Sequence, residues 1–139
     1  MSRSTYDQYL ETEVLSANPL QLTVMLYRAA IDSIAAARRH LRAGEIKQRS
    51  RRINKALEII SELTQSLNHE AGGEISRNLA GLYAYMQRRL IDANLEQAEP
   101  PLAEVESLLS TLLEAWCAAA PAASPVKIES EYAPVNCTC

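Results

Sequence analysis

Glycine and proline are sparse in this chain of 139 residues, which contains four glycines and six prolines. Because these two residues are the strongest local breakers of regular structure, their scarcity favours a few long helices over many short strands. The hydrophobic content of 47% includes only 5% aromatic residues, so alanine and aliphatic residues, which are good helix formers, supply most of it. We therefore expect an all-α fold.

Four helices are predicted from the turns that separate apolar stripes. The first begins with Asn18 as N-cap and Pro19 at the first helical position, and Gly44 ends it after residue 42. The others are predicted over 45–67, over 74–94 and from about 101 to about 117. Their apolar stripes, expected to face the core, contain Ile46, Ile53, Leu57, Ile60, Leu63 and Leu67, then Ile75, Leu79, Leu82, Tyr83, Met86, Leu90 and Ala93, and then Leu102, Val105, Leu109, Leu112 and Trp116. Short linkers between long helices favour antiparallel neighbours, so the expected architecture is an antiparallel up-down four-helix bundle.

The chain length fits one domain, and three parts are expected in it. The bundle is predicted over 18–118, and residues 119–139, rich in Ala, Pro and Ser at their start, are expected to be a flexible tail. Residues 1–17 carry Tyr6, Tyr9 and Leu10, which are large apolar side chains for a free end. This N-terminal segment is predicted to form a short lid helix over the bundle, either permanent or displaced by a ligand.

The first helix is unusual because it carries two apolar faces. At about 100° per residue, one face predicted for the core contains Leu20, Val24, Tyr27, Ile31 and Ile34. The second face lies nearly opposite and contains Leu22, Met25, Leu26 and Ala29. It is either covered by the N-terminal segment or by a partner in a homodimer, or it is an exposed groove that receives another protein. The candidate groove includes Ile59 and Leu63 of the second helix, with Ile59 expected to be exposed at the rim.

Catalytic and metal-binding motifs are not found in the sequence. The two histidines, His40 and His69, lie near predicted helix ends, and neither belongs to a Glu-x-x-His pair. There is no P-loop, dinucleotide-binding glycine pattern or His-Glu-x-x-His motif. One Cys-x-Cys, Cys137 to Cys139, is a weak metal signal. We therefore expect no enzymatic activity, no metal and no cofactor.

Nucleic acid and membrane are not expected partners. Basic residues crowd the junction of the first two helices, at Arg38, Arg39, Arg42, Lys47, Arg49, Arg51, Arg52 and Lys55. No aromatic residues alternate with them for base stacking, and the net charge of the chain is -3. No apolar run approaches the roughly 20 residues of a membrane-spanning helix, and the N-terminus lacks the apolar core of a signal peptide. A cytosolic protein is expected.

Three segments resemble the flagellar secretion chaperone FliS family. They are SANPLQLTVMLY, GGEISRNLAGLYAYMQRRLIDAN and EVESLLSTLLEAW, which span 16–27, 72–94 and 104–116. They match in order and approximate spacing, and the second is the most specific. Within it, Ala84 stands where the commonest family form has an aspartate, so any polar contact of that position is lost here.

The resemblance implies a small cytosolic four-helix bundle that binds the disordered C-terminal segment of flagellin. It further implies that binding prevents premature polymerisation of flagellin and that the complex is delivered to the export gate protein FlhA. In this family the N-terminal segment carries aromatic or apolar residues linked to delivery, and Tyr6 and Tyr9 correspond to them. Other flagellar regulators are further expected partners. The alternative is a structural bundle that forms a homodimer through the surplus apolar face and binds no flagellin.

Overall fold

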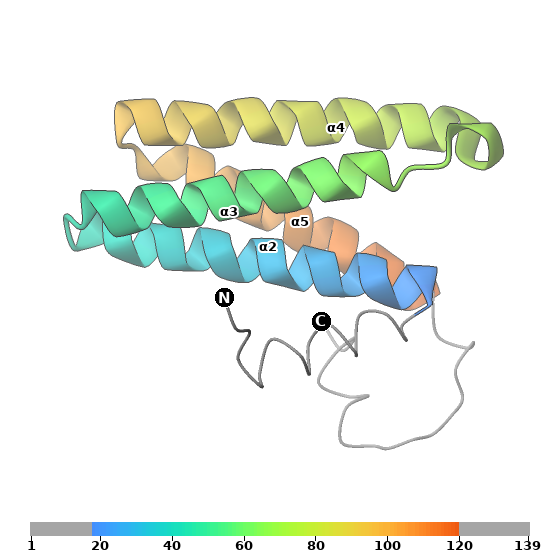
Figure 1. Ribbon diagram of the computed structural model, residues 1–139, viewed down its shortest axis with the longest axis horizontal. Helices are drawn as coiled ribbons and strands as arrows, with labels where there is room; N and C mark the ends of the chain where they lie inside the picture. The colour runs from blue at the N-terminus through green and yellow to red at the C-terminus, as the bar shows by residue number, and fades with distance from the viewer. Residues whose placement is uncertain (1–17, 120–139) are drawn as a thin grey trace, which may run out of the picture.

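The computed structural model describes residues 18–119, and its four helices span almost all of them (Figure 1). The helices are α2 (Pro19–Arg42), α3 (Ile46–Gln65), α4 (His69–Glu96) and α5 (Glu99–Ala119). The expected all-α fold is therefore confirmed. The predicted lid with Tyr6, Tyr9 and Leu10, the tail after Ala119 and the pair of cysteines at 137 and 139 lie outside the described residues.

The predicted start and end of α2 are confirmed. The Asn18 side chain accepts a hydrogen bond from the backbone N–H of Gln21 at 2.7 Å, and the Gln21 side chain accepts one from the Asn18 N–H at 3.2 Å. This reciprocal capping box satisfies two N–H groups that a helix start leaves without partners. Gly44 lies in the turn to α3 with φ of 74°, a left-handed conformation that glycine adopts without steric cost.

α4 begins earlier than predicted. The turn expected before residue 74 is itself helical from His69, because the Asn68 side chain accepts hydrogen bonds from the N–H groups of Glu70 and Ala71. Gly73 then has φ of 49° and ψ of -121°, so the backbone bends there and the helix resumes. The predicted start at residue 74 therefore corresponds to the start of the long straight part of α4.

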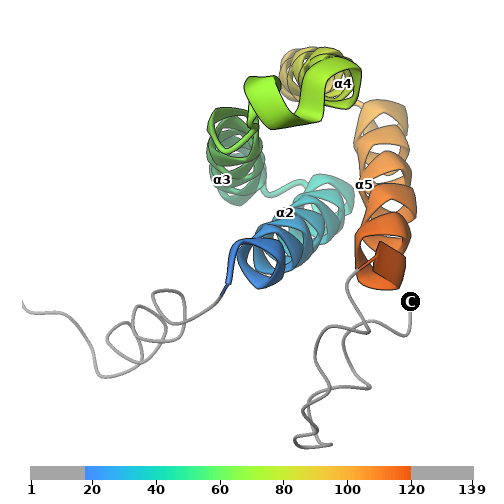
Figure 2. The same ribbon diagram turned by 90° about the vertical axis from the view of Figure 1, so that its right-hand side faces the viewer.

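The four helices form an antiparallel bundle in which each helix contacts two others. α2 contacts α3 and α5, and α4 contacts α3 and α5, so the helices stand in a ring (Figure 2). The core inside the ring contains the large fully buried residues Tyr27, Ile34, Ile53, Ile60, Leu63, Tyr83, Met86, Leu90, Leu102, Val105 and Leu109. Most of these were predicted from the apolar stripes.

Two isoleucines of the predicted stripes are not in the core. Ile46 is 56% exposed and Ile75 is 70% exposed. Each lies within a turn or two of a helix start, where the neighbouring helices no longer cover it. Helical periodicity gives the direction of a side chain, but it does not show where the partner helix ends.

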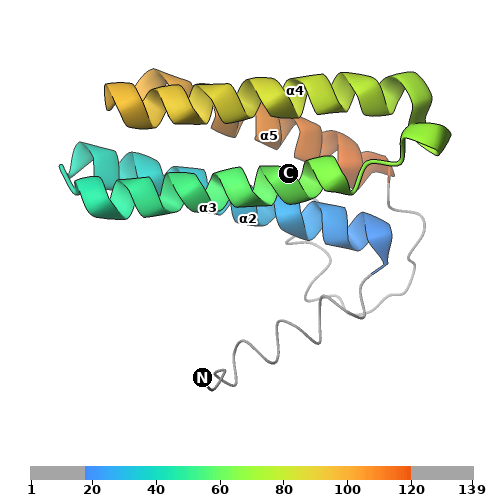
Figure 3. The ribbon, with the colours of Figure 1, turned by 45° about the horizontal axis from the view of Figure 1, so that its top comes forward.

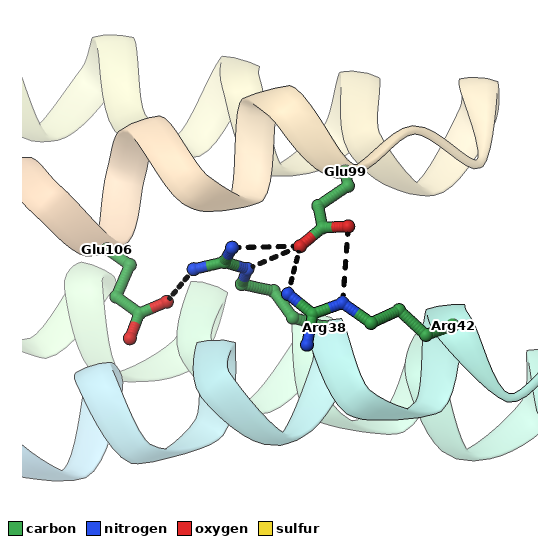
Figure 4. Close-up of polar contacts among 4 residues, drawn as sticks. All are labelled: Arg38, Arg42, Glu99 and Glu106. Carbon is green, nitrogen blue, oxygen red and sulfur yellow. Dashed lines mark hydrogen bonds and ion pairs between the residues drawn. The ribbon is translucent and has the colours of Figure 1, made fainter.

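A charged cluster joins the end of α2 to the start of α5 (Figure 4). Arg38 donates to Glu99 at 2.9 Å and to Glu106 at 2.8 Å, and Arg42 also pairs with Glu99. Arg42 lies in the last turn of α2 and Glu99 in the first turn of α5, so each charge also interacts favourably with the dipole of its own helix. Hydrogen bonds from Arg42 and Arg38 lower the pKa of Glu99 to about 2.

Replacing Glu99 by glutamine is expected to reduce the acid dependence of stability. Because the pKa of Glu99 is depressed in the folded protein, its charge stabilises the fold above its ordinary pKa of 4.5, and this stabilisation is lost as the pH falls toward about 2. The Glu99→Gln variant should therefore be less stable than the wild type at pH 7, and the two should converge near pH 2. Urea unfolding of both proteins between pH 7 and pH 2 measures this difference in the free energy of unfolding.

The matched control is Glu114→Gln, on the same helix. Glu114 is exposed and forms no ion pair with another residue of the described part of the chain. Its replacement should leave the pH profile unchanged. An equal change in both variants would show that the arginine cluster does not carry the effect.

Candidate binding grooves

The second apolar face of α2 is only partly buried. Leu22, Met25 and Leu26 are half-buried, and Ala29 is exposed. Leu26 packs against the edge of the core, whereas Leu22 and Met25 are outside the core cluster and its packed neighbours. Two of the large side chains of this face are therefore not used to hold the four described helices together.

A shallow groove follows the junction of α2 and α3, which lie side by side (Figure 3). Its volume is ≈ 420 Å³, and its lining residues are Leu26, Lys55, Glu58, Ile59, Ser61 and Glu62. The structure thus brings two predicted groove residues, Leu26 and Ile59, to one surface. The charged residues Lys55, Glu58 and Glu62 were not predicted to line the groove, although their spacing of three and four places them on one side of α3.

The expectation that Ile59 is an exposed anchor is wrong, because its side chain is 6% exposed. Leu63, assigned to the same groove, is 1% exposed and belongs to the core. Both residues lie on the side of α3 that faces α2, and these two helices make the most extensive contact in the bundle. Ile59 therefore forms part of the floor of the groove, and Leu63 lies beneath the surface.

A second cavity of ≈ 230 Å³ opens at the end of the bundle where α2 begins and α5 ends. Residues from all four helices line it: Thr23, Leu63, Ser66, Leu67, Asn68, Gly72, Ile75, Ser76, Leu79, Tyr83 and Trp116. The exposed Ile75 stands at this cavity. Its lining is mainly apolar, which suits a hydrophobic side chain more than a charged ligand.

A pair of tyrosines forms the polar centre of the core beside this cavity. The hydroxyl oxygens of Tyr27 and Tyr83 are 2.7 Å apart, and the Trp116 ring lies 6.2 Å from the Tyr27 ring. Burial raises the pKa of both tyrosines, so both hydroxyls stay neutral at physiological pH. The prediction that Tyr83 points inward is confirmed. Tyr85 instead donates a hydrogen bond to Glu104 of α5 at 2.6 Å.

Some of the basic residues at the junction of α2 and α3 form contacts within the bundle. Arg38 and Arg42 pair with α5, and Arg49 is 4% exposed. Arg49 donates to the Asn94 side-chain oxygen at 3.2 Å, and Ser50 donates to the same atom at 3.0 Å. These contacts link α3 to α4, so Arg38, Arg42 and Arg49 help to hold neighbouring helices together.

Within residues 18–119, no three His, Cys, Asp or Glu side chains are grouped so that they could hold a metal ion. None of the described helices combines the length and the hydrophobicity that crossing a membrane requires.

The described helices define the class of the protein as an all-α antiparallel helical bundle with shallow surface grooves, and comparison with known proteins identifies its family. The family model described as flagellar protein FliS matches residues 2–123. The chain is 42% identical over 116 residues to the flagellar secretion chaperone FliS of Salmonella typhimurium, covering 83% of this chain and 86% of that protein. It is 32% identical over 114 residues to the flagellar secretion chaperone FliS of Bacillus subtilis, covering 82% and 84%.

A third relative, the flagellar secretion chaperone FliSB of Pseudomonas aeruginosa, is 36% identical over 107 residues, covering 77% of this chain and 85% of that protein. The chain belongs to the FliS family of flagellar secretion chaperones. The resemblance stated from its three sequence segments is thereby confirmed.

Proposed function

We propose that this protein is a cytosolic export chaperone that binds the disordered C-terminal segment of flagellin. It keeps flagellin from polymerising before export and delivers it to the export gate protein FlhA. The observation that carries the proposal is the second apolar face of α2, since Leu22 and Met25 are half-buried and yet outside the core. Membership of the FliS family supports the same conclusion.

The proposed client site combines this face with the groove beside it. Leu22, Met25 and Leu26 would contact apolar side chains of flagellin, Ala29 leaves room for the client backbone, and Ile59 forms the floor. Lys55 and Glu62 at the rim can form hydrogen bonds with polar groups of the client. Leu63, which is 1% exposed, supports the floor without contact to the client.

The shape of the surface suits a disordered client. A segment that folds on binding loses conformational entropy, so it needs a long contact surface rather than one deep pocket. The α2/α3 groove is shallow and runs beside an apolar helix face, and the bundle-end cavity adds a further apolar position. Prevention of polymerisation then requires no chemical step, because the bound apolar stripe of flagellin is no longer free to associate.

Tyr6, Tyr9 and Leu10 are proposed to act in delivery to FlhA and as a lid that the client displaces. Deletion of Met1 to Glu11 should leave the bundle folded, since the four described helices already bury a shared apolar core against one another. The deletion variant should bind the flagellin segment and fail to bind FlhA. Loss of cooperative thermal unfolding would instead make the segment a part of the core.

The decisive experiment mixes the purified chain with a C-terminal flagellin fragment from the same organism. The two should elute together in size-exclusion chromatography, and a fragment that lacks the C-terminal segment should not. Failure to bind any flagellin of that organism would overturn the proposal. A tight homodimer in sedimentation, combined with no flagellin binding, would favour the structural-bundle alternative.

A further inference from the structure

Three exposed apolar residues lie at the end of the bundle opposite to the bundle-end cavity. Ile46 near the start of α3 is 56% exposed, and Ile91 and Leu95 near the end of α4 are 47% and 77% exposed. They were not part of the proposed client site. Ile91 and Leu95 are four residues apart, so they form one apolar strip on the helix surface.

The contact between α3 and α4 brings this strip and Ile46 together. The Asn94 side chain accepts hydrogen bonds from Arg49 and Ser50, so the end of α4 lies against the first turns of α3. Figure 3 shows these two helix ends side by side. Ile46 precedes Ser50 by one turn, and Ile91 and Leu95 flank Asn94. We call Ile46, Ile91 and Leu95 the α3/α4 patch.

Positive charge surrounds the α3/α4 patch. Lys47, Arg51 and Arg88 are exposed, and none forms an ion pair with a carboxylate of residues 18–119. Arg88 lies over the Tyr85 ring at 5.8 Å, which leaves its charge at the surface. These three residues are called the basic rim below.

The carboxylates near this end do not neutralise the basic rim. The Glu45 carboxylate lies 2.6 Å from a nitrogen of the His40 ring, and Asp92 pairs with Arg89. Glu96 follows Arg89 by seven residues, which is two helical turns, so it lies on the side of α4 that faces α5. The buried Arg49, whose partner is an uncharged amide, adds further positive charge beneath the patch.

The α3/α4 patch and its basic rim together favour one kind of binding partner over another. A second copy of the chain would place its own basic rim against Lys47, Arg51 and Arg88, and like charges at an interface are repulsive. A segment with apolar side chains on one face and Asp or Glu beside them would bury the patch and neutralise the rim. An apolar strip of i and i+4 spacing on a helix surface also matches the side-chain spacing of another helix.

We propose that the α3/α4 patch is a docking site for an acidic amphipathic helix of a second protein. The patch lies at the opposite end of the bundle from Leu22 and Met25 (Figure 1). The two surfaces can therefore be occupied at the same time, and docking at the patch does not depend on flagellin binding.

The test uses a fluorescently labelled designed peptide as probe. It is about 20 residues long, enough to form a helix, with leucines on one face and glutamates beside them. A matched peptide has lysines in place of the glutamates. The wild-type chain should bind the glutamate peptide in fluorescence anisotropy and bind the lysine peptide at least about tenfold more weakly. Binding of the glutamate peptide should also weaken as salt is raised.

Variants then assign the binding to the patch. Leu95→Ser and Ile91→Ser should each lower the affinity for the glutamate peptide at least about tenfold. Lys47→Glu combined with Arg51→Glu should lower it by as much. Ile75→Ser is the matched control, since Ile75 is 70% exposed at the other end of the same helix. It should leave the affinity for the glutamate peptide unchanged, because Ile75 lies outside the α3/α4 patch. All these residues are exposed, so thermal unfolding should confirm that each variant is folded.

Three results would overturn the proposal: no binding of the glutamate peptide, equal binding of the lysine peptide, or an equal loss in Ile75→Ser. A fourth result, measured by sedimentation, would also overturn it. If the wild type is a dimer and Leu95→Ser is a monomer, a second copy of the chain binds the patch. Leu95→Ser should retain wild-type binding of the flagellin fragment, which keeps failure at this patch distinct from failure of the proposed chaperone function.

Discussion

Replacing Tyr83 by alanine is expected to lower the free energy of unfolding by about 3–5 kcal/mol, as for other large aromatic residues removed from a core. The Tyr83 side chain is 1% exposed, and its ring packs edge-on against Tyr27 with the ring centres 6.4 Å apart. Its removal leaves a cavity and also deprives the Tyr27 hydroxyl of its 2.7 Å partner. Because small domains are stable by only about 5–15 kcal/mol, the variant should be close to unfolding.

Urea unfolding followed by circular dichroism measures the loss, and two variants serve as controls. Tyr83→Phe keeps the ring and removes only the hydroxyl that pairs with Tyr27, so it should cost about 1–3 kcal/mol and less than Tyr83→Ala. Tyr85→Ala affects the neighbouring tyrosine of the same segment, which is half-buried and contacts Glu104 at the surface of the bundle. It should cost much less than Tyr83→Ala. Equal losses for Tyr83 and Tyr85 would contradict the assignment of Tyr83 to the core.

The double replacement Leu22→Asp with Met25→Asp is expected to weaken binding of the flagellin fragment at least about 100-fold, equivalent to roughly 2.7 kcal/mol. The two carboxylates would be buried against apolar client side chains without partners, and such burial is costly. Since neither residue packs against the core, the variant should remain folded. Isothermal titration with the C-terminal flagellin fragment measures the change.

Leu95→Asp is the control for this second prediction. It introduces the same charge at a residue that is 77% exposed and distant from the α2 face. The control should bind flagellin as the wild type does. A folded double variant with unchanged affinity would show that the second face of α2 is not the client site, whereas an unfolded one would show that it belongs to the core.

Helix positions were predictable because their signals are local. Asn18 followed by Pro19 marked a helix start, and the capping hydrogen bonds of Asn18 confirm the physical reason. Gly44 marked a helix end, and its positive φ confirms that as well. The apolar stripe through Tyr83, Met86 and Leu90 lies in the core. It was predictable because apolar residues recur there every three to four positions over several turns.

Exposure at the margins of each helix was not predictable in the same way. Ile59 was expected at the surface and is buried, because α2 lies close along that side of α3. Ile75 was expected in the core and is exposed, because it stands beyond the covered part of α4. Both outcomes depend on the position of a neighbouring helix, which the residue spacing within one helix does not contain. The buried Arg49 depends likewise on Asn94 of another helix.

Trp116 gives this molecule a natural optical probe. It is the only tryptophan in the chain, it lines the bundle-end cavity, and its ring lies 6.2 Å from that of Tyr27. Indole emission moves to shorter wavelength when water leaves its surroundings, so an apolar side chain that enters the cavity shifts the spectrum without any attached dye. A client segment that lacks tryptophan can therefore be followed by emission from the protein that receives it.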